Sequence, residues 1–350
     1  MRVVVSGYYG YGNAGDEAVL AGLLRTLRDI DPGLEAVVVS GDPAATRRDH
    51  GVEAVPRMGL PAIMRTLRGA DGLVSGGGSL LQDRTSARPV AYYAGLMLLA
   101  RTLGRRYVVH AQGLGPIDRG LNRRLAATAL RGAALVSFRD EASIALAREL
   151  GVRRPIDLVP DPALALTPPT PSASDGGPIV VAVRDWPGGA PMLDMIRAGL
   201  ERLAGGAPIV ALPMQRGVDV EPSRRVVAGV AGAEVLEGDP SLDDVLATIA
   251  GARLVIGMRL HALILAAASG VPAVAISYDP KVDAFAAQAG QPVVARIGAP
   301  KPIDPDAFAA AARTAADAGG AVTAERVAAM REELRRAAER SLGALRGGRP

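Results

Sequence analysis

The stretch SGYYGYGNAGDEAVL, residues 6–20, follows the apolar run Val3 to Val5, which predicts a buried strand. Its glycines Gly10, Gly12 and Gly15 have the spacing G-x-G-x-x-G, and a helical pattern begins directly after them. A strand, a glycine-rich loop and a helix in this order are typical of the first unit of a parallel α/β domain. The stretch therefore predicts the fold class.

The same loop is a poor match to a dinucleotide-binding site. Asp16 and Glu17 open the predicted helix, where their carboxylates would repel a diphosphate from the positive helix end. No acid ends the second predicted strand either, because Glu35 begins that strand and Asp42 lies beyond it. These residues argue against a dinucleotide oxidoreductase.

The composition is that of a soluble globular protein of two domains. The chain has 350 residues, of which 49% are hydrophobic and 22% charged, with a net charge of +4. It has no cysteine, and its three histidines lie far apart without metal-ligand spacing, so we expect neither a disulfide nor a metal site, and no bound cofactor. The N-terminus has no secretory signal pattern, and the weakly polar stretch 262–278 is interrupted by Ser, Gly and Pro. We expect a cytoplasmic chain that at most contacts a membrane surface.

Short β-branched runs alternate with longer amphipathic segments along the chain, which predicts two Rossmann-like doubly wound domains with a cleft between them. The expected domains are 1–166 on the acceptor side and 178–315 on the donor side. The Pro- and Ser-rich stretch 167–177 is interpreted as a linker, and 316–350 as a C-terminal helix and tail. The predicted strands are 3–5, 36–40, 72–75, 107–111, 135–138, 156–159, 179–183, 209–212, 234–236, 254–256, 273–276 and 293–295.

Four cations follow predicted strands at the edge where ligands bind in such sheets, namely Arg139, Arg184, Arg259 and Lys281. Convergent arginines and a lysine favour an anion with several acceptor oxygens. The alternative is that they are ordinary ion-paired loop residues.

His261 also follows a predicted strand, two residues after Arg259, and an imidazole there can exchange a proton near neutral pH. His110 lies inside a predicted buried strand and is interpreted as structural, and His50 as a solvated loop residue.

Asp16 has two interpretations, as a first-turn acid that stabilises its helix or as a group that orients an acceptor hydroxyl. Tyr8, Tyr9, Tyr11 and Asn13 share its loop, and tyrosine rings with hydroxyl groups suit contact with a sugar or a membrane interface. The glycines Gly76, Gly77 and Gly78 are candidates for contact with an anion, although a tight turn alone explains such a run. Trp186 is a weaker candidate for the donor pocket.

Seven segments in this order resemble the polysaccharide pyruvyl transferases, in particular the CsaB-type enzymes of bacterial cell-wall anchoring. The likeness covers residues 1 to about 313, and its segments are GYYGYGNAGDEAVL, SGGGSLLQD, AQGLGPI, FRDEAS, DPAL, MRLHALILA and SYDPKVDAF. The resemblance implies a GT-B-like fold and transfer of pyruvate from phosphoenolpyruvate to a sugar as a cyclic ketal, with release of phosphate. In the CsaB type it implies a lipid-linked acceptor that ends in N-acetylmannosamine and a product polymer that S-layer homology domains recognise.

Carried over by motif, the residues that matter are Asp16, Arg139, His261 and Lys281, with Arg259 beside them. We expect phosphoenolpyruvate to contact Arg139, Arg184, Arg259, Lys281 and the glycines 76–78, and the acceptor to contact Asp16, Asn13 and the loop tyrosines. A peripheral contact with the inner membrane leaflet is the expectation for a lipid-linked acceptor.

Two other classes remain open. A GT-B glycosyltransferase that uses a nucleotide sugar could hold its diphosphate with the same cations. A non-catalytic saccharide-binding protein is the second, although the full set of ionisable residues argues against it. Nucleic-acid binding is not expected, since no basic stripe with stacking aromatics is visible.

Overall fold

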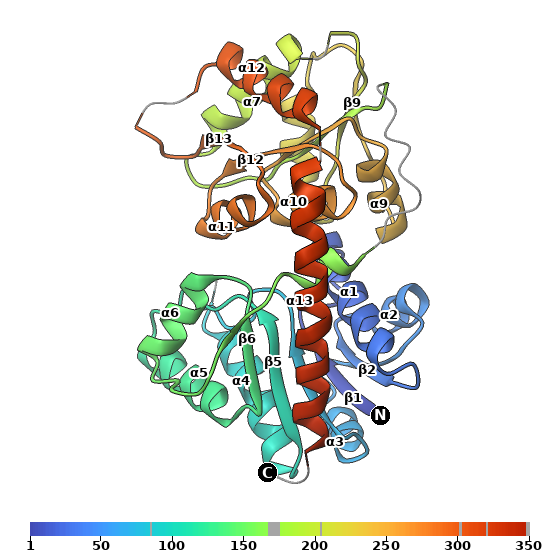
Figure 1. The fold of residues 1–350 in the computed structure, drawn as a ribbon, viewed down its shortest axis with the longest axis vertical. Helices are drawn as coiled ribbons and strands as arrows, with labels where there is room; N and C mark the ends of the chain where they lie inside the picture. Colours follow the sequence, from blue (N-terminus) through green and yellow to red (C-terminus); the bar gives the residue numbers. More distant parts are fainter. Residues whose placement is uncertain (85, 167–175, 204, 301–302, 320, 348–350) are drawn as a thin grey trace. The chain divides into compact units, whose positions relative to one another are not determined.

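The computed structural model describes residues 1–84, 86–166, 176–203, 205–300, 303–319 and 321–347. The chain divides into two compact units (Figure 1). Unit 1 comprises residues 1–11, 16–165 and 330–350, and unit 2 comprises residues 12–15 and 166–329.

Unit 1 is built on a parallel sheet of seven strands in the order β3-β2-β1-β4-β5-β6-β7. Val4 of β1 is in register with Val37 of β2 on one side and Leu73 of β4 on the other. The central strands are buried on both faces, as the continuous apolar run at Val3 to Val5 predicts. The strands are β1 (Arg2–Ser6), β2 (Glu35–Ser40), β3 (Glu53–Pro56), β4 (Gly72–Gly76), β5 (Arg106–Gln112), β6 (Leu135–Phe138) and β7 (Asp157–Leu158).

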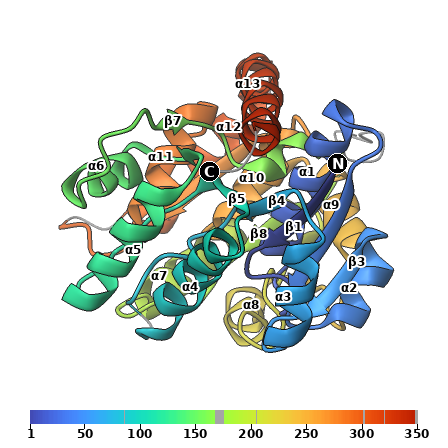
Figure 2. The ribbon, with the colours of Figure 1, turned by 90° about the horizontal axis from the view of Figure 1, so that it is seen from below.

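Helices cover both faces of this sheet (Figure 2). One core contains Val3 and Val5 of β1 together with α1 (Ala14–Ile30) and the C-terminal part of α13 (Ala321–Arg346). The opposite core contains Val4 of β1 and the apolar sides of the other helices, because alternate residues of a strand face opposite ways. These helices are α3 (Leu60–Arg68), α4 (Arg88–Thr102), α5 (Gly120–Gly132) and α6 (Glu141–Glu149), while α2 (Pro43–His50) packs on β2 and β3.

Unit 2 has a parallel sheet of six strands in the order β10-β9-β8-β11-β12-β13. Its strands are β8 (Ile179–Ala182), β9 (Ile209–Ala211), β10 (Ala233–Val235), β11 (Leu254–Gly257), β12 (Ala273–Ser277) and β13 (Val293–Arg296). Its helices are α7 (Ala190–Leu203), α8 (Val220–Val227), α9 (Leu242–Ala250), α10 (Leu260–Ala268), α11 (Pro280–Ala289) and α12 (Pro305–Ala318). The apolar faces of α7, α8 and α12 form one core with the sheet.

The strand order reverses once in each sheet, between β1 and β4 in unit 1 and between β8 and β11 in unit 2. Ligands of open α/β sheets bind outside the carboxyl ends of the strands at such reversal points. The loops that follow β1, β4, β8 and β11 are therefore the positions where a site is expected.

The predicted alternation of strands and helices and the two-domain α/β class are confirmed, and each predicted strand overlaps an observed one. The edge strand β3 was not predicted, because four residues that end in proline carry no β-branched run. Most of the predicted linker, residues 167–175, lies outside the described residues.

Two histidines are held by hydrogen bonds in unit 1. The interpretation of His50 as solvated is wrong, because its side chain is buried and its Nε2 lies 3.0 Å from Glu17 Oε2. The structural interpretation of His110 is confirmed, since its ring is fully buried in β5 and its Nδ1 lies 2.9 Å from Ser341 Oγ of α13. Burial, together with a smaller effect of nearby Arg340, lowers the pKa of His110 to about 4.

His110 makes stability depend on pH in a defined window. The ring is neutral in the folded protein but gains a proton near pH 6.5 when the chain unfolds, so its contribution to stability is complete above that pH and is lost toward pH 4. The two pKa values correspond to about 3 kcal/mol. We expect the wild type to lose about 2 kcal/mol more stability than His110→Gln between pH 7 and pH 4.5 in urea unfolding, because pH 4.5 lies inside this window. Equal losses in both proteins would contradict the assignment.

Candidate active site

The first half of the glycine-rich loop belongs to unit 1, and its three tyrosines have different positions. Tyr9 is 1% exposed and its hydroxyl donates to the carbonyl of Gly76, at 2.9 Å, so it fills the reversal point between β1 and β4. The expectation that Tyr9 contacts an acceptor is therefore corrected, because its ring is part of the core. Tyr8 and Tyr11 are exposed and stack on each other, with ring centroids 4.4 Å apart.

The glycines after β4 lie against helix α1. A Cβ atom on Gly77, which has φ +55°, would meet Val19 at 1.9 Å, and one on Gly76 would meet Leu23 at 2.6 Å. Gly78 is next to the carboxylate of Asp16, since its Cβ would lie 3.3 Å from Asp16 Oδ1. Close backbone packing thus explains this glycine run, and Asp16, in the first turn of α1, is the ionisable group that it borders.

Arg139, which follows β6, is 8% exposed and forms a buried ion pair. Its Nη1 donates to Asp161 Oδ2 at 2.5 Å, and its Nη2 donates to Ser79 Oγ at 3.1 Å. A Cβ on Gly113 would lie 3.4 Å from the guanidinium. Four segments of the sequence therefore meet around the Arg139 guanidinium, namely SGGGS, AQGLG, FRDEAS and DPAL.

Residues 12–15 form part of unit 2. The amide of Ala14 donates to the carbonyl of Met214 at 2.8 Å, and Asn13 pairs with Gln215 in an antiparallel bridge. A Cβ on Gly15 would lie 2.2 Å from Nδ1 of His261 in the first turn of α10. The third glycine of the motif thus allows the loop to approach the imidazole rather than a diphosphate.

Arg259 precedes α10 and is 9% exposed. Its Nε donates to Asp219 Oδ2 at 2.7 Å, its Nη2 donates to the other oxygen of that carboxylate, and the same Nη2 donates to Gln215 Oε1 at 3.1 Å. Because Gln215 also pairs with Asn13, the loop, Arg259 and the start of α10 belong to one network.

Arg184 and Lys281 share the ring of Tyr278. The Arg184 Cζ lies 5.4 Å from the centroids of both Tyr278 and Trp186, and the Lys281 Nζ lies 5.8 Å from that of Tyr278. The Lys281 Nζ is 3.9 Å from Asp279 Oδ2, whereas among the described residues no carboxylate lies within ion-pair distance of Arg184. Cations on aromatic faces keep part of their charge directed to solvent, so this cluster is suited to an anionic ligand.

Neighbouring strands bring the predicted residues of unit 2 to one edge of the sheet. Arg184 follows β8, Arg259 and His261 follow β11, and Lys281 follows β12, and these three strands are adjacent and parallel. The four residues therefore lie at the carboxyl edge around the reversal point.

Sequence reasoning missed three residues that define these clusters, Asp161, Asp219 and Tyr278. Asp161 and Asp219 neutralise Arg139 and Arg259 in buried pairs, and Lys281 has a longer, partly exposed pair with Asp279, so the ion-pair alternative holds for three of the four predicted cations. Tyr278 follows β12 directly in a chain with 3% aromatic residues, and that rarity was the available signal. Asp219 lies in a stretch without any recognisable pattern.

Among the described residues, no group of three His, Asp or Glu side chains could hold a metal ion. In the same part of the chain, no helix is both long and apolar enough to cross a membrane.

Several solved structures share this fold over nearly the whole chain. Anabaena HepE in complex with UDP and glucose is 13% identical with a TM-score of 0.62, and covers 99% of both chains. A putative UDP-N-acetylglucosamine 2-epimerase from Listeria monocytogenes is 14% identical, with a TM-score of 0.63, over 100% of this chain and 98% of that one. S. aureus MnaA with UDP is 12% identical, with a TM-score of 0.61, over 100% and 99%. These neighbours show the two-domain GT-B-like fold. No match is found among curated proteins.

The two parallel α/β sheets define a protein of the GT-B-like fold class. The family model for polysaccharide pyruvyl transferases matches residues 13–280, which is more than half of the chain. The chain belongs to the polysaccharide pyruvyl transferase family.

Substitution of Gly15 tests the contact with His261. In Gly15→Ala the new methyl group would overlap the imidazole, so the ring or the loop must shift, and a shift of about 1 Å can cost roughly a hundredfold in rate. We expect kcat to fall by about that factor, with the His261 ring resonances displaced in NMR spectra.

The control is Gly120→Ala, at the start of α5, where a Cβ meets nothing within 4 Å. Because the chain has three histidines, the rings of His50 and His110 report in the same spectra whether the fold is intact. A native fold with full activity in Gly15→Ala would contradict a role for this contact.

Proposed function

We propose that the protein transfers the pyruvyl group of phosphoenolpyruvate to a saccharide as a cyclic ketal and releases phosphate. The observation that carries the proposal is the set of cations and the histidine at the carboxyl ends of the adjacent strands β8, β11 and β12, in a member of this family. Phosphoenolpyruvate carries a carboxylate and a phosphate a few bonds apart, and two cations on one aromatic ring are suited to bind these two anionic groups.

The reaction needs proton transfers and neutralisation of a leaving group. A proton adds to the methylene carbon of phosphoenolpyruvate, and one sugar hydroxyl attacks the resulting cationic carbon and loses its proton. The bond between that carbon and the phosphate oxygen then breaks, phosphate leaves with a proton, and the second hydroxyl closes the ring and loses its own proton. A general acid, a general base and cations aimed at the phosphate are sufficient for these steps.

Arg184 and Lys281 are the proposed ligands of the phosphate and the carboxylate, because Arg139 and Arg259 are largely neutralised by their buried aspartates. We retain Arg139 and Arg259 in the proposed donor-binding set as fixed hydrogen-bond donors. Trp186 and Tyr278 supply the aromatic floor. The glycines 76–78 remain in the proposal only through the contact of Gly78 with Asp16.

His261 is the proposed proton carrier, either to the departing phosphate or from a sugar hydroxyl. It lies in the first turn of α10, where the partial positive charge of the helix end favours an anionic group. Asp16 is proposed to orient the acceptor hydroxyls, with Tyr8, Tyr11 and Asn13 as further acceptor contacts.

The proposed acceptor is a lipid-linked cell-wall saccharide that ends in N-acetylmannosamine, bridged at its 4- and 6-hydroxyls, as in the CsaB type. The proposed role is modification of a secondary cell-wall polymer that anchors an S-layer. A lipid-linked acceptor places the protein in the cytoplasm, at the inner face of the membrane.

Ligand binding separates this function from glycosyl transfer. We expect calorimetry to detect binding of phosphoenolpyruvate and not of UDP- or GDP-sugars. Incubation with phosphoenolpyruvate and a synthetic lipid-linked acceptor should release phosphate and add the mass of a ketal-linked pyruvyl group to the sugar. The protein would instead be a glycosyltransferase if it bound a nucleotide sugar, transferred the sugar, and released no phosphate from phosphoenolpyruvate.

Two charge-removing substitutions test the donor ligands. A hydrogen bond to a charged group contributes about 1.5–3 kcal/mol, so Arg184→Met and Lys281→Met should each raise KM for phosphoenolpyruvate by about tenfold or more. Arg197→Met is the matched control, because Arg197 is an exposed arginine of α7 that pairs with Glu201. An unchanged KM in both variants, with the fold intact, would remove these residues from the donor site.

A further inference from the structure

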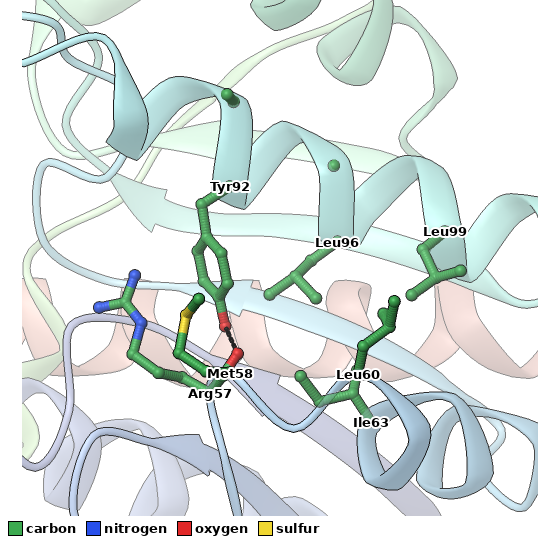
Figure 3. Close-up of a pocket in the computed structure, with 9 residues that line it drawn as sticks. Arg57, Met58, Leu60, Ile63, Tyr92, Leu96 and Leu99 are labelled. Carbon is green, nitrogen blue, oxygen red and sulfur yellow. Dashed lines mark hydrogen bonds between the residues drawn. The ribbon is translucent and has the colours of Figure 1, made fainter.

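An apolar groove lies on unit 1 between α3 and α4 (Figure 3). Its volume is about 360 Å³. The residues that line it are Arg57, Met58, Leu60, Ile63, Ala91, Tyr92, Gly95, Leu96 and Leu99. Neither the proposed reaction nor the packing of the core requires an open apolar groove here.

Two large apolar side chains that are close in sequence are exposed at the rim of the groove. Met58 is 82% exposed and Leu60 is 54% exposed, although both side chains are apolar. Isolated exposed apolar residues are ordinary, but here they border a groove whose floor is also apolar. Leu60 opens α3, and Pro61 follows it at a position where its missing N–H costs no hydrogen bond, so the rim is rigid.

The segments that line the groove carry arginines and no acidic residue. Residues 57–70 contain three arginines, residues 84–99 contain two, and neither stretch contains Asp or Glu. Arg88 is exposed one turn before Tyr92, on the groove side of α4, and Arg68 is exposed at the end of α3. Arg340 on α13 is, in contrast, paired with Asp157.

Arg57 stands at the mouth of the groove and is oriented by tyrosines instead of carboxylates. Its Cζ lies 4.3 Å from the ring centroid of Tyr92, and its Nη1 donates to the hydroxyl of Tyr11 at 2.9 Å. The Tyr92 hydroxyl in turn donates to the carbonyl of Arg57 at 2.8 Å, which the close-up shows as a dashed line (Figure 3). No carboxylate of the described residues forms an ion pair with this guanidinium, and such a cation beside exposed apolar side chains suits a surface that is both anionic and apolar.

We propose that this face, defined by Met58, Leu60, Arg57, Arg68 and Arg88 and called the α3–α4 face, docks on an anionic lipid bilayer. Met58 and Leu60 enter the acyl region, and the arginines contact lipid phosphates. Charge complementarity favours this occupant, because an anionic bilayer offers both negative headgroups and an apolar interior, whereas a second copy of this chain has a net charge of +4. The inference deepens the proposed function, which places the acceptor in a membrane, but its test does not measure pyruvyl transfer.

Vesicle sedimentation with the full-length protein tests the α3–α4 face. We expect binding to vesicles that contain phosphatidylglycerol, little binding to phosphatidylcholine vesicles, and release as salt screens the charges. The double variant Met58→Ser/Leu60→Ser should bind the anionic vesicles at least about tenfold more weakly, given the usual gain from burying two large apolar side chains. Arg88→Glu should also weaken binding by about tenfold, and an acid in the first turn of α4 favours the helix, so misfolding does not explain that loss.

Matched controls lie elsewhere on unit 1. Leu158→Ser alters an exposed leucine of the edge strand β7, and Arg153→Glu alters an exposed arginine outside the basic stretches. Both should bind vesicles like the wild type. Wild-type protein that ignores anionic vesicles at low salt, or equal losses in the test and control variants, would overturn the proposal. Phosphate release with a soluble acceptor should be unchanged in Met58→Ser/Leu60→Ser, so failure of the docking face and failure of the reaction are distinguishable.

Discussion

The site depends on positions where glycine, which has no side chain, lets the main chain lie directly against neighbouring groups. At Gly15 the loop after β1 lies so near the His261 ring that a single methyl group would overlap the imidazole. At Gly76 and Gly77 the loop after β4 lies equally close to α1. The second contact lies in unit 1 at the point where the strand order reverses, and there the buried Tyr9 donates its hydroxyl hydrogen to the carbonyl of Gly76. The glycine motif therefore does not form a diphosphate site here. Its third glycine lets the main chain pack against the His261 ring, and Asp16 follows directly at the end of the loop.

The four predicted cations fall into two classes that cannot be distinguished from the sequence. Arg139 and Arg259 each have a buried aspartate, and such pairs orient a guanidinium without leaving a net charge. Arg184 and Lys281 lie instead on the ring of Tyr278, where an aromatic face holds a cation and leaves it attractive to an anion. In the proposed donor site, a phosphate group would gain more from the second class.

Much of the fold was predictable, because parallel strands buried on both faces are continuous β-branched runs and the glycine and proline residues mark their ends. The strand β3 was missed because it is short, lies at an edge and ends in proline. The candidate residues that follow strands, Arg184, Arg259, His261 and Lys281, could be found because topology alone places strand ends along one edge. The partners Asp161 and Asp219 could not, since a pairing across 22 or 40 residues of sequence depends on the packing of loops. Tyr9 was misassigned for a similar reason, because three tyrosines in one loop look alike in sequence and only the packing on Gly76 distinguishes them.

The division of the chain has a consequence for attempts to produce its halves separately. Unit 2 includes residues 12–15, which pair with residues 214–216 and cover His261, and unit 1 includes the end of α13, with Ser341 beside His110 and Leu342 in its core. A single cut between the two sheets would thus remove a core helix from the amino-terminal fragment and uncover an imidazole in the carboxyl-terminal one. Neither fragment would be a self-sufficient folding module, so the polypeptide must be made as one piece or rejoined by complementation.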